Sequence, residues 1–153
     1  MEIEPITDVG ADQPAETAAQ QTGFTAEEST YADTVTAQVA DMKESLDRAN
    51  ALFLAPRIGQ DDWTLAVVVE LVYWKQAYKD AQALNPPPAF AEIHDLYLNS
   101  LSLFSSAADD IIYGIDHADA DRFTQAGSKV TEASVKMGEA SRLVDELVKE
   151  RGG

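Results

Sequence analysis

Residues Pro86 to Ile115 read PPPAFAEIHDLYLNSLSLFSSAADDIIYGI, and the pattern of this stretch indicates the architecture of the chain. Three prolines end the preceding element, because proline lacks the backbone N–H that a helix interior needs. Eight residues then follow at alternating spacings of four and three, which places them on one face of a helix. They are Phe90, His94, Tyr97, Leu101, Phe104, Ala108, Ile111 and Ile115. A helix with so wide an apolar face must pack against others, so the stretch predicts a helical core.

The bulk composition fits one globular domain and excludes several kinds of site. The chain has 153 residues and no cysteine, which excludes disulfides, thiolate zinc sites, iron–sulfur clusters and cysteine nucleophiles. Its 27 acids against 11 bases give a net charge of −16. Such a field repels phosphate groups, so the charge argues against binding to nucleic acid or to anionic lipid. The longest apolar run has about half of the roughly 20 residues that a membrane span needs.

The first 23 residues differ in character from the rest. They carry five acids and no base, and two prolines and two glycines interrupt any periodicity. We predict that residues 1–23 form a disordered acidic leader or tether and that residues 24–153 form the folded domain.

Helix start and stop signals divide that domain into four helices of similar length. Thr25 and Glu28 form a capping-box pattern, and Pro56 ends the helix that follows it. The expected helices are Thr25 to about Ala55, Asp61 or Asp62 to about Leu84, the opening stretch, and about Asp119 to Glu150. Short connections force each helix to run antiparallel to the one before. The sequence therefore predicts an all-α, up-down-up-down antiparallel four-helix bundle.

The second helix allows two apolar faces, which differ in where they put Glu70. The first contains Trp63, Val67, Glu70, Trp74, Ala77, Ala81 and Leu84, and buries the carboxylate in the seam. The second contains Val67, Leu71, Trp74, Tyr78 and Ala81, and leaves Glu70 at the flank. Burying a lone carboxylate is costly, so we favour the second face.

The last helix carries an unbroken heptad pattern. Its seam is Phe123, Ala126, Val130, Ala133, Met137, Ala140, Val144 and Leu147. The alternate alanines predict close approach by a neighbouring helix, and we expect Gly127 and Gly138 to extend that close contact.

Two places in the chain could hold a ligand or metal. His94 lies on the seam of the third helix, where a packed, hydrogen-bonded histidine is the favoured interpretation and a haem or metal ligand the alternative. Asp116, Asp119 and Asp121 make an acidic turn with the oxygen ligands that calcium prefers. Aspartates at helix starts also serve as caps, which is the favoured interpretation.

No catalytic group or cofactor is predicted. The serines of the third helix lack a nearby base, and no glycine-rich phosphate loop is present. The second helix has more large apolar residues than one buried face needs. We therefore predict a partner surface at Leu65, Val68, Val72 and Tyr73.

Residues Pro86 to Phe90, His94, Tyr97 and the turn Gly114-Ile115-Asp116 resemble a pattern in bacterial extracytoplasmic and lipoprotein-type helical bundles. The resemblance covers about residues 86 to 147 and implies a location in the cell envelope. We expect a non-enzymatic, envelope-associated or secreted bundle that binds a protein partner or small ligand. The alternatives are a cytoplasmic acidic protein that occupies a basic partner surface, and a metal- or cofactor-binding bundle.

Overall fold

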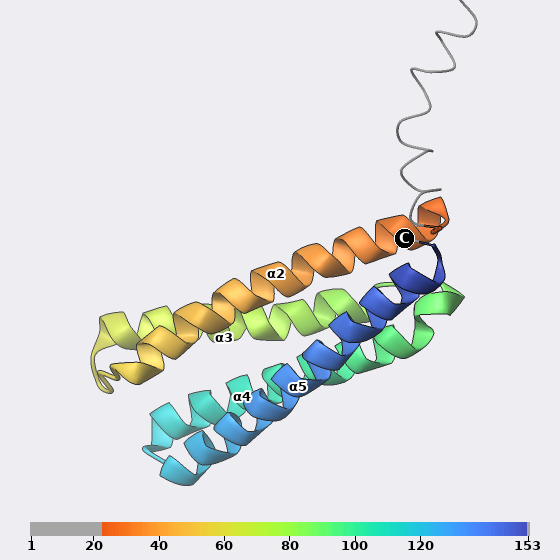
Figure 1. Ribbon diagram of the computed structural model, residues 1–153. Helices are drawn as coiled ribbons and strands as arrows, with labels where there is room; N and C mark the ends of the chain where they lie inside the picture. The colour runs from red at the N-terminus through yellow and green to blue at the C-terminus, as the bar shows by residue number, and fades with distance from the viewer. Residues whose placement is uncertain (1–22, 153) are drawn as a thin grey trace, which may run out of the picture.

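The computed structural model describes residues 23–152, and over this range it contains four α-helices, one short 3-10 helix and no strand (Figure 1). The elements are α2 (Ala26–Leu54), α3 (Asp61–Gln82), η1 (Pro88–Phe90), α4 (Ala91–His117) and α5 (Ala120–Glu150). The all-α fold is confirmed, and each helix begins and ends within a few residues of its expected bounds. The predicted leader lies outside the described residues except for Gly23.

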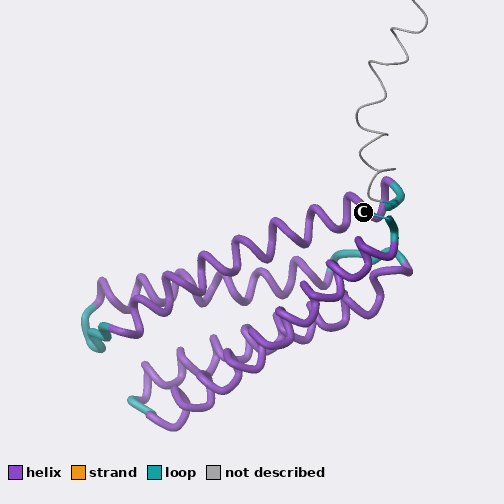
Figure 2. The backbone as a smooth tube through the Cα atoms, in the orientation of Figure 1, coloured by secondary structure: helices purple, strands orange, loops and turns teal. Residues whose placement is uncertain are grey.

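Successive helices run in opposite directions and are joined by short turns (Figures 1 and 2). α4 is the central element, because it packs along both α3 and α5, while α2 packs on α3. Figure 1 shows the α2–α3 pair diverging from the α4–α5 pair toward the end of the bundle that carries the 55–60 turn. The first and last helices therefore leave one side of the bundle open.

Aromatic residues of α3 and α4 form the centre of the core. Trp63, Trp74, Tyr97 and Phe104 are all buried, and the Trp74 and Phe104 rings meet edge to face with centroids 5.5 Å apart. The neighbouring helix that approaches the alanines of α5 closely is α4, since the Ser100 hydroxyl donates to the Ala133 carbonyl at 2.7 Å. The alanine row of α5 allows this spacing because it holds no larger side chain between the helices.

Two expectations about packing are wrong. Gly127 and Gly138 do not extend the α4–α5 contact: a Cβ atom at either would have no neighbour within 4 Å. Glu70 lies in the buried face of α3, together with Trp63, Val67, Leu71 and Trp74, and not at its flank.

The burial of Glu70 is explained by two donors on α2. Ser45 Oγ donates to Glu70 Oε1 at 2.7 Å, and the Arg48 guanidinium bonds both carboxylate oxygens at 2.9 and 3.2 Å. Burial by itself would raise the pKa of Glu70, but the hydrogen bonds from Arg48 and Ser45 outweigh it and hold the pKa below its ordinary value. A paired carboxylate avoids the cost that the sequence argument assigned to a lone one.

The two chain ends of the bundle are joined by an ion pair. The predicted capping box at Thr25 and Glu28 is present, with bonds of 2.9 and 3.1 Å. Arg151, just after α5, donates to both oxygens of the same Glu28 carboxylate at 2.6 and 2.9 Å and to the Gly23 carbonyl at 3.0 Å. This clasp holds α2 and α5 together at the end opposite the 55–60 turn.

Candidate functional site

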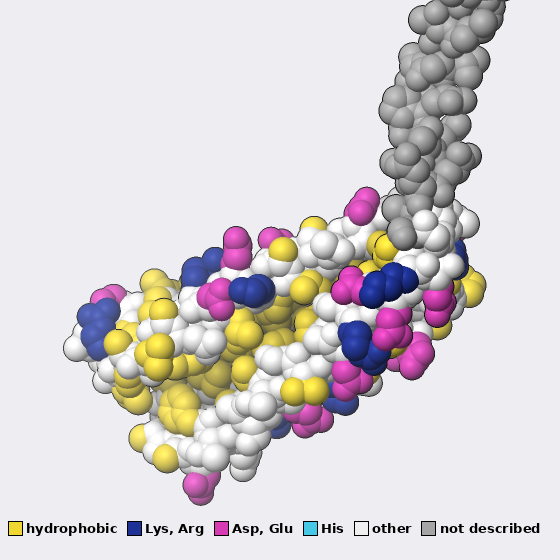
Figure 3. All heavy atoms as spheres, in the orientation of Figure 1, with side chains coloured by type: hydrophobic (Ala, Val, Ile, Leu, Met, Phe, Trp, Pro, Cys, Tyr) yellow, Lys and Arg dark blue, Asp and Glu magenta, His cyan; other side chains and the backbone are white. Residues whose placement is uncertain are grey.

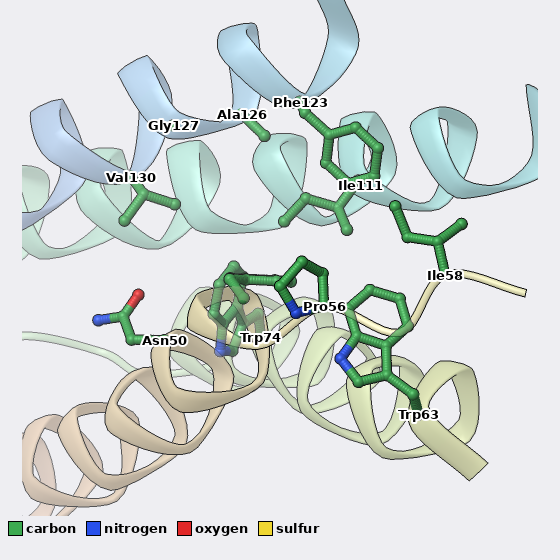
Figure 4. Close-up of a pocket in the computed structure, with 11 residues that line it drawn as sticks. Asn50, Pro56, Ile58, Trp63, Trp74, Ile111, Phe123, Ala126, Gly127 and Val130 are labelled. Atoms are coloured by element: carbon green, nitrogen blue, oxygen red, sulfur yellow. The ribbon is translucent and has the colours of Figure 1, made fainter. Parts of the chain in front are cut away.

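An apolar cavity of about 370 Å³ lies at the open end of the bundle, between the α2–α3 pair and the α4–α5 pair (Figure 4). Its walls come from all four helices and from the turn after α2. The lining residues are Asn50, Phe53, Pro56, Ile58, Trp63, Trp74, Ile111, Phe123, Ala126, Gly127 and Val130. Figure 4 shows the indole of Trp63 on one side and the Phe123 ring and Ile111 on the other.

The two tryptophans on the α3 side are held by hydrogen bonds to α2. Trp63 Nε1 donates to the Leu52 carbonyl at 3.0 Å, and Trp74 Nε1 donates to Ser45 Oγ at 3.0 Å. Because each indole N–H is already bonded, the rings offer the cavity only apolar surface. Pro56 forms part of the same wall because it follows the end of α2 at Leu54 and begins the turn toward α3.

Small residues on the α4–α5 side make room for the cavity. Gly114 allows the Phe123 ring to lie against α4, since a Cβ atom there would be 3.0 Å from the ring. Ala126 is buried against α4, and Gly127 has open space where a side chain would be. A Cβ atom at position 127 would therefore meet no neighbour, and a side chain there would begin in open space beside the cavity wall.

Asn50 is the one polar side chain of the lining apart from the bonded indoles. Its side chain is exposed at the edge of the cavity, and within the described part of the chain its amide makes no hydrogen bond to protein. Among the described residues, no Asp, Glu, His, Lys or Arg lines the cavity. The site can therefore enclose an apolar molecule and bond one polar group, but its lining supplies no general acid, base or charged nucleophile.

The cavity is the wide end of a longer groove between α2 and α5. Hollows of about 280 and 210 Å³ follow it toward the chain termini. Val39 and Leu46 of α2, and Met137 and Val144 of α5, contribute to these hollows. Figure 3 shows hydrophobic side chains gathered in the hollowed surface between the two helices.

His94 is placed as a packed residue rather than at this site. Its ring is buried, its Nδ1 lies 2.7 Å from the Tyr31 hydroxyl, and the two rings are in contact. Burial lowers the pKa of His94 below its ordinary value, against a smaller opposing effect of Asp95. The same burial raises the pKa of Tyr31 to about 12. The pair is a neutral hydrogen bond between α2 and α4.

The acidic turn does not assemble as a metal centre. Asp119 Oδ1 accepts from the backbone N–H groups of Asp121 and Arg122 at 3.0 and 3.3 Å, which is the geometry of a helix cap. Asp116 and Asp121 are exposed. Over residues 23–152, no group of three or more His, Cys, Asp or Glu is arranged to hold a metal ion.

The four residues predicted as a partner surface lie on one side of α3. Leu65 and Val72 are exposed, whereas Val68 and Tyr73 are half-buried. Val69, between them, is also exposed and was not among the predicted residues. This surface is separate from the cavity, which contacts α3 only through Trp63 and Trp74.

Sequence reasoning missed the cavity because it placed every large residue of the α5 seam in the core. Only the alanines of the seam, Ala126, Ala133 and Ala140, are buried. The larger residues Phe123, Val130 and Met137 are half-buried and face the groove. The signal that could have found the groove is the alternation of alanine with larger residues along that seam. The alanines of the seam face α4, and the larger residues that alternate with them face the open side of the bundle.

Comparisons with protein-family models, with curated proteins and with solved structures found no match. None of the described helices combines the length and the apolar character needed to cross a bilayer. Fold and site together define a four-helix bundle that is open along one side and has an apolar cavity at one end.

Proposed function

We propose that this protein is a non-enzymatic binding protein whose cavity between the helix pairs holds a small apolar ligand. The observation that carries the proposal is the cavity of about 370 Å³. This volume falls within the range of about 300–1,000 Å³ that is typical of small-molecule sites. An apolar lining with one unbonded polar side chain is also typical of such sites.

The lining indicates the chemistry of the ligand. Without a charged residue in the wall, an ionic ligand would lose its hydration and gain no partner, so the ligand is neutral. Trp63, Trp74 and Phe123 offer ring surfaces that suit a flat aromatic or branched hydrocarbon body. One hydroxyl, carbonyl or amide of the ligand would bond the free Asn50 amide.

The cavity can be tested with a neutral apolar fluorophore, N-phenyl-1-naphthylamine, because the two tryptophans of the chain both line the wall. Binding should quench tryptophan emission by energy transfer and raise the emission of the probe. Gly127→Leu should weaken binding at least tenfold, because the new side chain takes up space at the cavity wall.

Gly138→Leu is the matched control. Position 138 lies on the same helix and has the same free space around its Cβ position, but it lines the adjacent hollow of the groove and not the cavity itself. Both substitutions should raise helix stability, since glycine is about 1 kcal/mol less favourable than a good helix former. Equal probe affinity in the two variants, or no saturable binding to the unmodified protein, would contradict the proposal.

The envelope or secreted location implied by the resemblance, and the cytoplasmic alternative, stay predictions. The gene upstream of Met1 would separate them. A hydrophobic segment that ends in a cleavage site supports the first, and a ribosome-binding site directly before Met1 supports the second.

A further inference from the structure

A second row of residues at heptad spacing runs along the solvent side of α3. Its members follow one another at spacings of three, four, three, four and three, so they form one continuous stripe. They are Asp62, Leu65, Val69, Val72, Gln76 and Lys79. All six are exposed. We call this row the outer stripe of α3.

The centre of the outer stripe is apolar and its ends are charged. Leu65, Val69 and Val72 keep 65%, 57% and 56% of their surface in contact with solvent. Half-buried Val68 and Tyr73 flank them on either side. Single exposed apolar residues are common, but three on successive turns with apolar flanks are typical of an interaction surface.

The charges at the two ends indicate what covers the stripe. Two copies of α3 that cross antiparallel on a two-fold axis between Val69 and Val72 would place each Val69 beside the partner's Val72. The same register puts Asp62 opposite the partner's Lys79, and Leu65 opposite the partner's Gln76. Lys79 makes no ion pair within residues 23–152, whereas the exposed Asp62 carboxylate pairs with Arg57 through Oδ2 at 2.9 Å, so the partner's Lys79 would bond the second oxygen of that carboxylate. A parallel pair would instead put like charges together.

We propose that the outer stripe is a dimerisation face, and that its partner is a second copy of this chain docked antiparallel on it. The self-complementary order of acid, apolar centre and base is what a two-fold interface requires. The two cavities remain accessible in such a dimer, because they lie on the other side of α3. The inference therefore does not depend on the proposed ligand.

The overall negative charge opposes dimerisation and predicts how the affinity of the dimer should change with salt. Each chain carries −16, so two copies repel one another at low ionic strength. Salt screens this repulsion over about 10 Å at 0.1 M and leaves the apolar contact intact. The dimer should therefore become tighter between about 10 mM and 200 mM salt, opposite to an interface held mainly by ion pairs.

The first test is sedimentation velocity of the full chain from about 10 μM to 1 mM, the range expected for a small, weak interface. Val69→Lys should raise the dimer dissociation constant at least tenfold. Val135→Lys is the matched control, because Val135 is 59% exposed on α5 and lies outside the stripe. Both positions are exposed, and circular dichroism confirms that each variant is folded.

The second test examines direction and register. Asp62→Lys and Lys79→Asp should each weaken self-association severalfold, because each puts like charges opposite one another twice. A mixture of the two variants should form a heterodimer about as tight as the unmodified dimer, since both opposed pairs become complementary. A monomer at every concentration overturns the proposal. So does a dimer that Val69→Lys leaves intact, or one whose charge variants do not recover on mixing.

Discussion

Replacing Ser45 with alanine tests how much the buried hydrogen bonds between α2 and α3 contribute to the free energy of unfolding. The Ser45 hydroxyl is fully buried and serves two partners at once. It donates to Glu70 Oε1 at 2.7 Å and accepts from Trp74 Nε1 at 3.0 Å. Ser45→Ala therefore removes a donor from a buried carboxylate and leaves a buried indole N–H without a partner.

The expected loss follows from these two bonds. A hydrogen bond to a charged group contributes about 1.5 kcal/mol at the low end of its range, and an unsatisfied buried N–H costs a similar amount, about 1.5 kcal/mol. The higher helix propensity of alanine returns about 0.5 kcal/mol. Ser45→Ala should thus lower the free energy of unfolding by about 2.5 kcal/mol at pH 7. In a domain of this size that corresponds to a fall in melting temperature of about 10 °C.

The measurement is urea unfolding followed by circular dichroism and by tryptophan emission. Ser102→Ala in α4 is the control, because Ser102 is half-buried in a helix and its hydroxyl makes no hydrogen bond within the described chain. The control should change stability by less than about 0.5 kcal/mol.

The pH dependence of the free energy of unfolding gives a second check on the same hydrogen bonds. Hydrogen bonding holds the folded-state pKa of Glu70 below the ordinary value of 4.5, so its stabilising effect is present above that pH and is lost as the pH falls through the folded pKa. Loss of Ser45 should raise that pKa, which makes the cost of Ser45→Ala smaller near pH 4 than at pH 7. Equal losses in Ser45→Ala and Ser102→Ala would refute the reasoning.

Four further predictions concern other groups. Burial keeps the folded-state pKa of His94 below its ordinary 6.5, so stability should fall as the pH drops below 6.5, and His94→Gln should flatten that dependence in unfolding curves measured from about pH 7 to 5. Lys129→Met leaves the buried Asp110 carboxylate with Arg122 as its one remaining cation, and calorimetry at pH 7 should show a loss of about 1–2 kcal/mol. Arg151→Ala removes the clasp on Glu28, so amide hydrogen exchange should accelerate in the first turn of α2 and the last turn of α5 but not in the middle of either helix. Asn50→Leu should weaken binding of apolar ligands that carry a hydroxyl while leaving the affinity for the matching hydrocarbon unchanged in the fluorescence assay.

Local signals were sufficient for most of the secondary structure. The Thr25–Glu28 capping box and Pro56 bracket α2, and the prolines before Phe90 separate α3 from α4. Each of these signals acts over three or four residues, so no knowledge of the neighbouring helices is needed. The alanine row of α5 likewise predicted a close neighbour, because the size of a side chain limits the approach of a second backbone.

The same reasoning failed where the outcome depended on residues far apart in the chain. Glu70 is buried because Ser45 and Arg48, 25 and 22 positions away, supply its donors. Gly127 and Gly138 face an open groove, although Gly127 directly follows the buried Ala126 and Gly138 lies two residues before the buried Ala140. Periodicity places a residue on a face of its own helix but does not say what lies opposite that face.

The amino-acid pattern thus accounts for four helices and their order, because hydrophobic spacing and caps are local properties of the chain. The divergence of the two helix pairs, and with it the cavity beside Trp63 and Phe123, appears only in the folded bundle. The physical reason is that α2 and α5 meet at their termini through Glu28 and Arg151, while large side chains such as Phe53, Val130 and Met137 only half fill the space between them. Whether that space closes depends on the summed packing of four helices, which no single stretch of sequence contains.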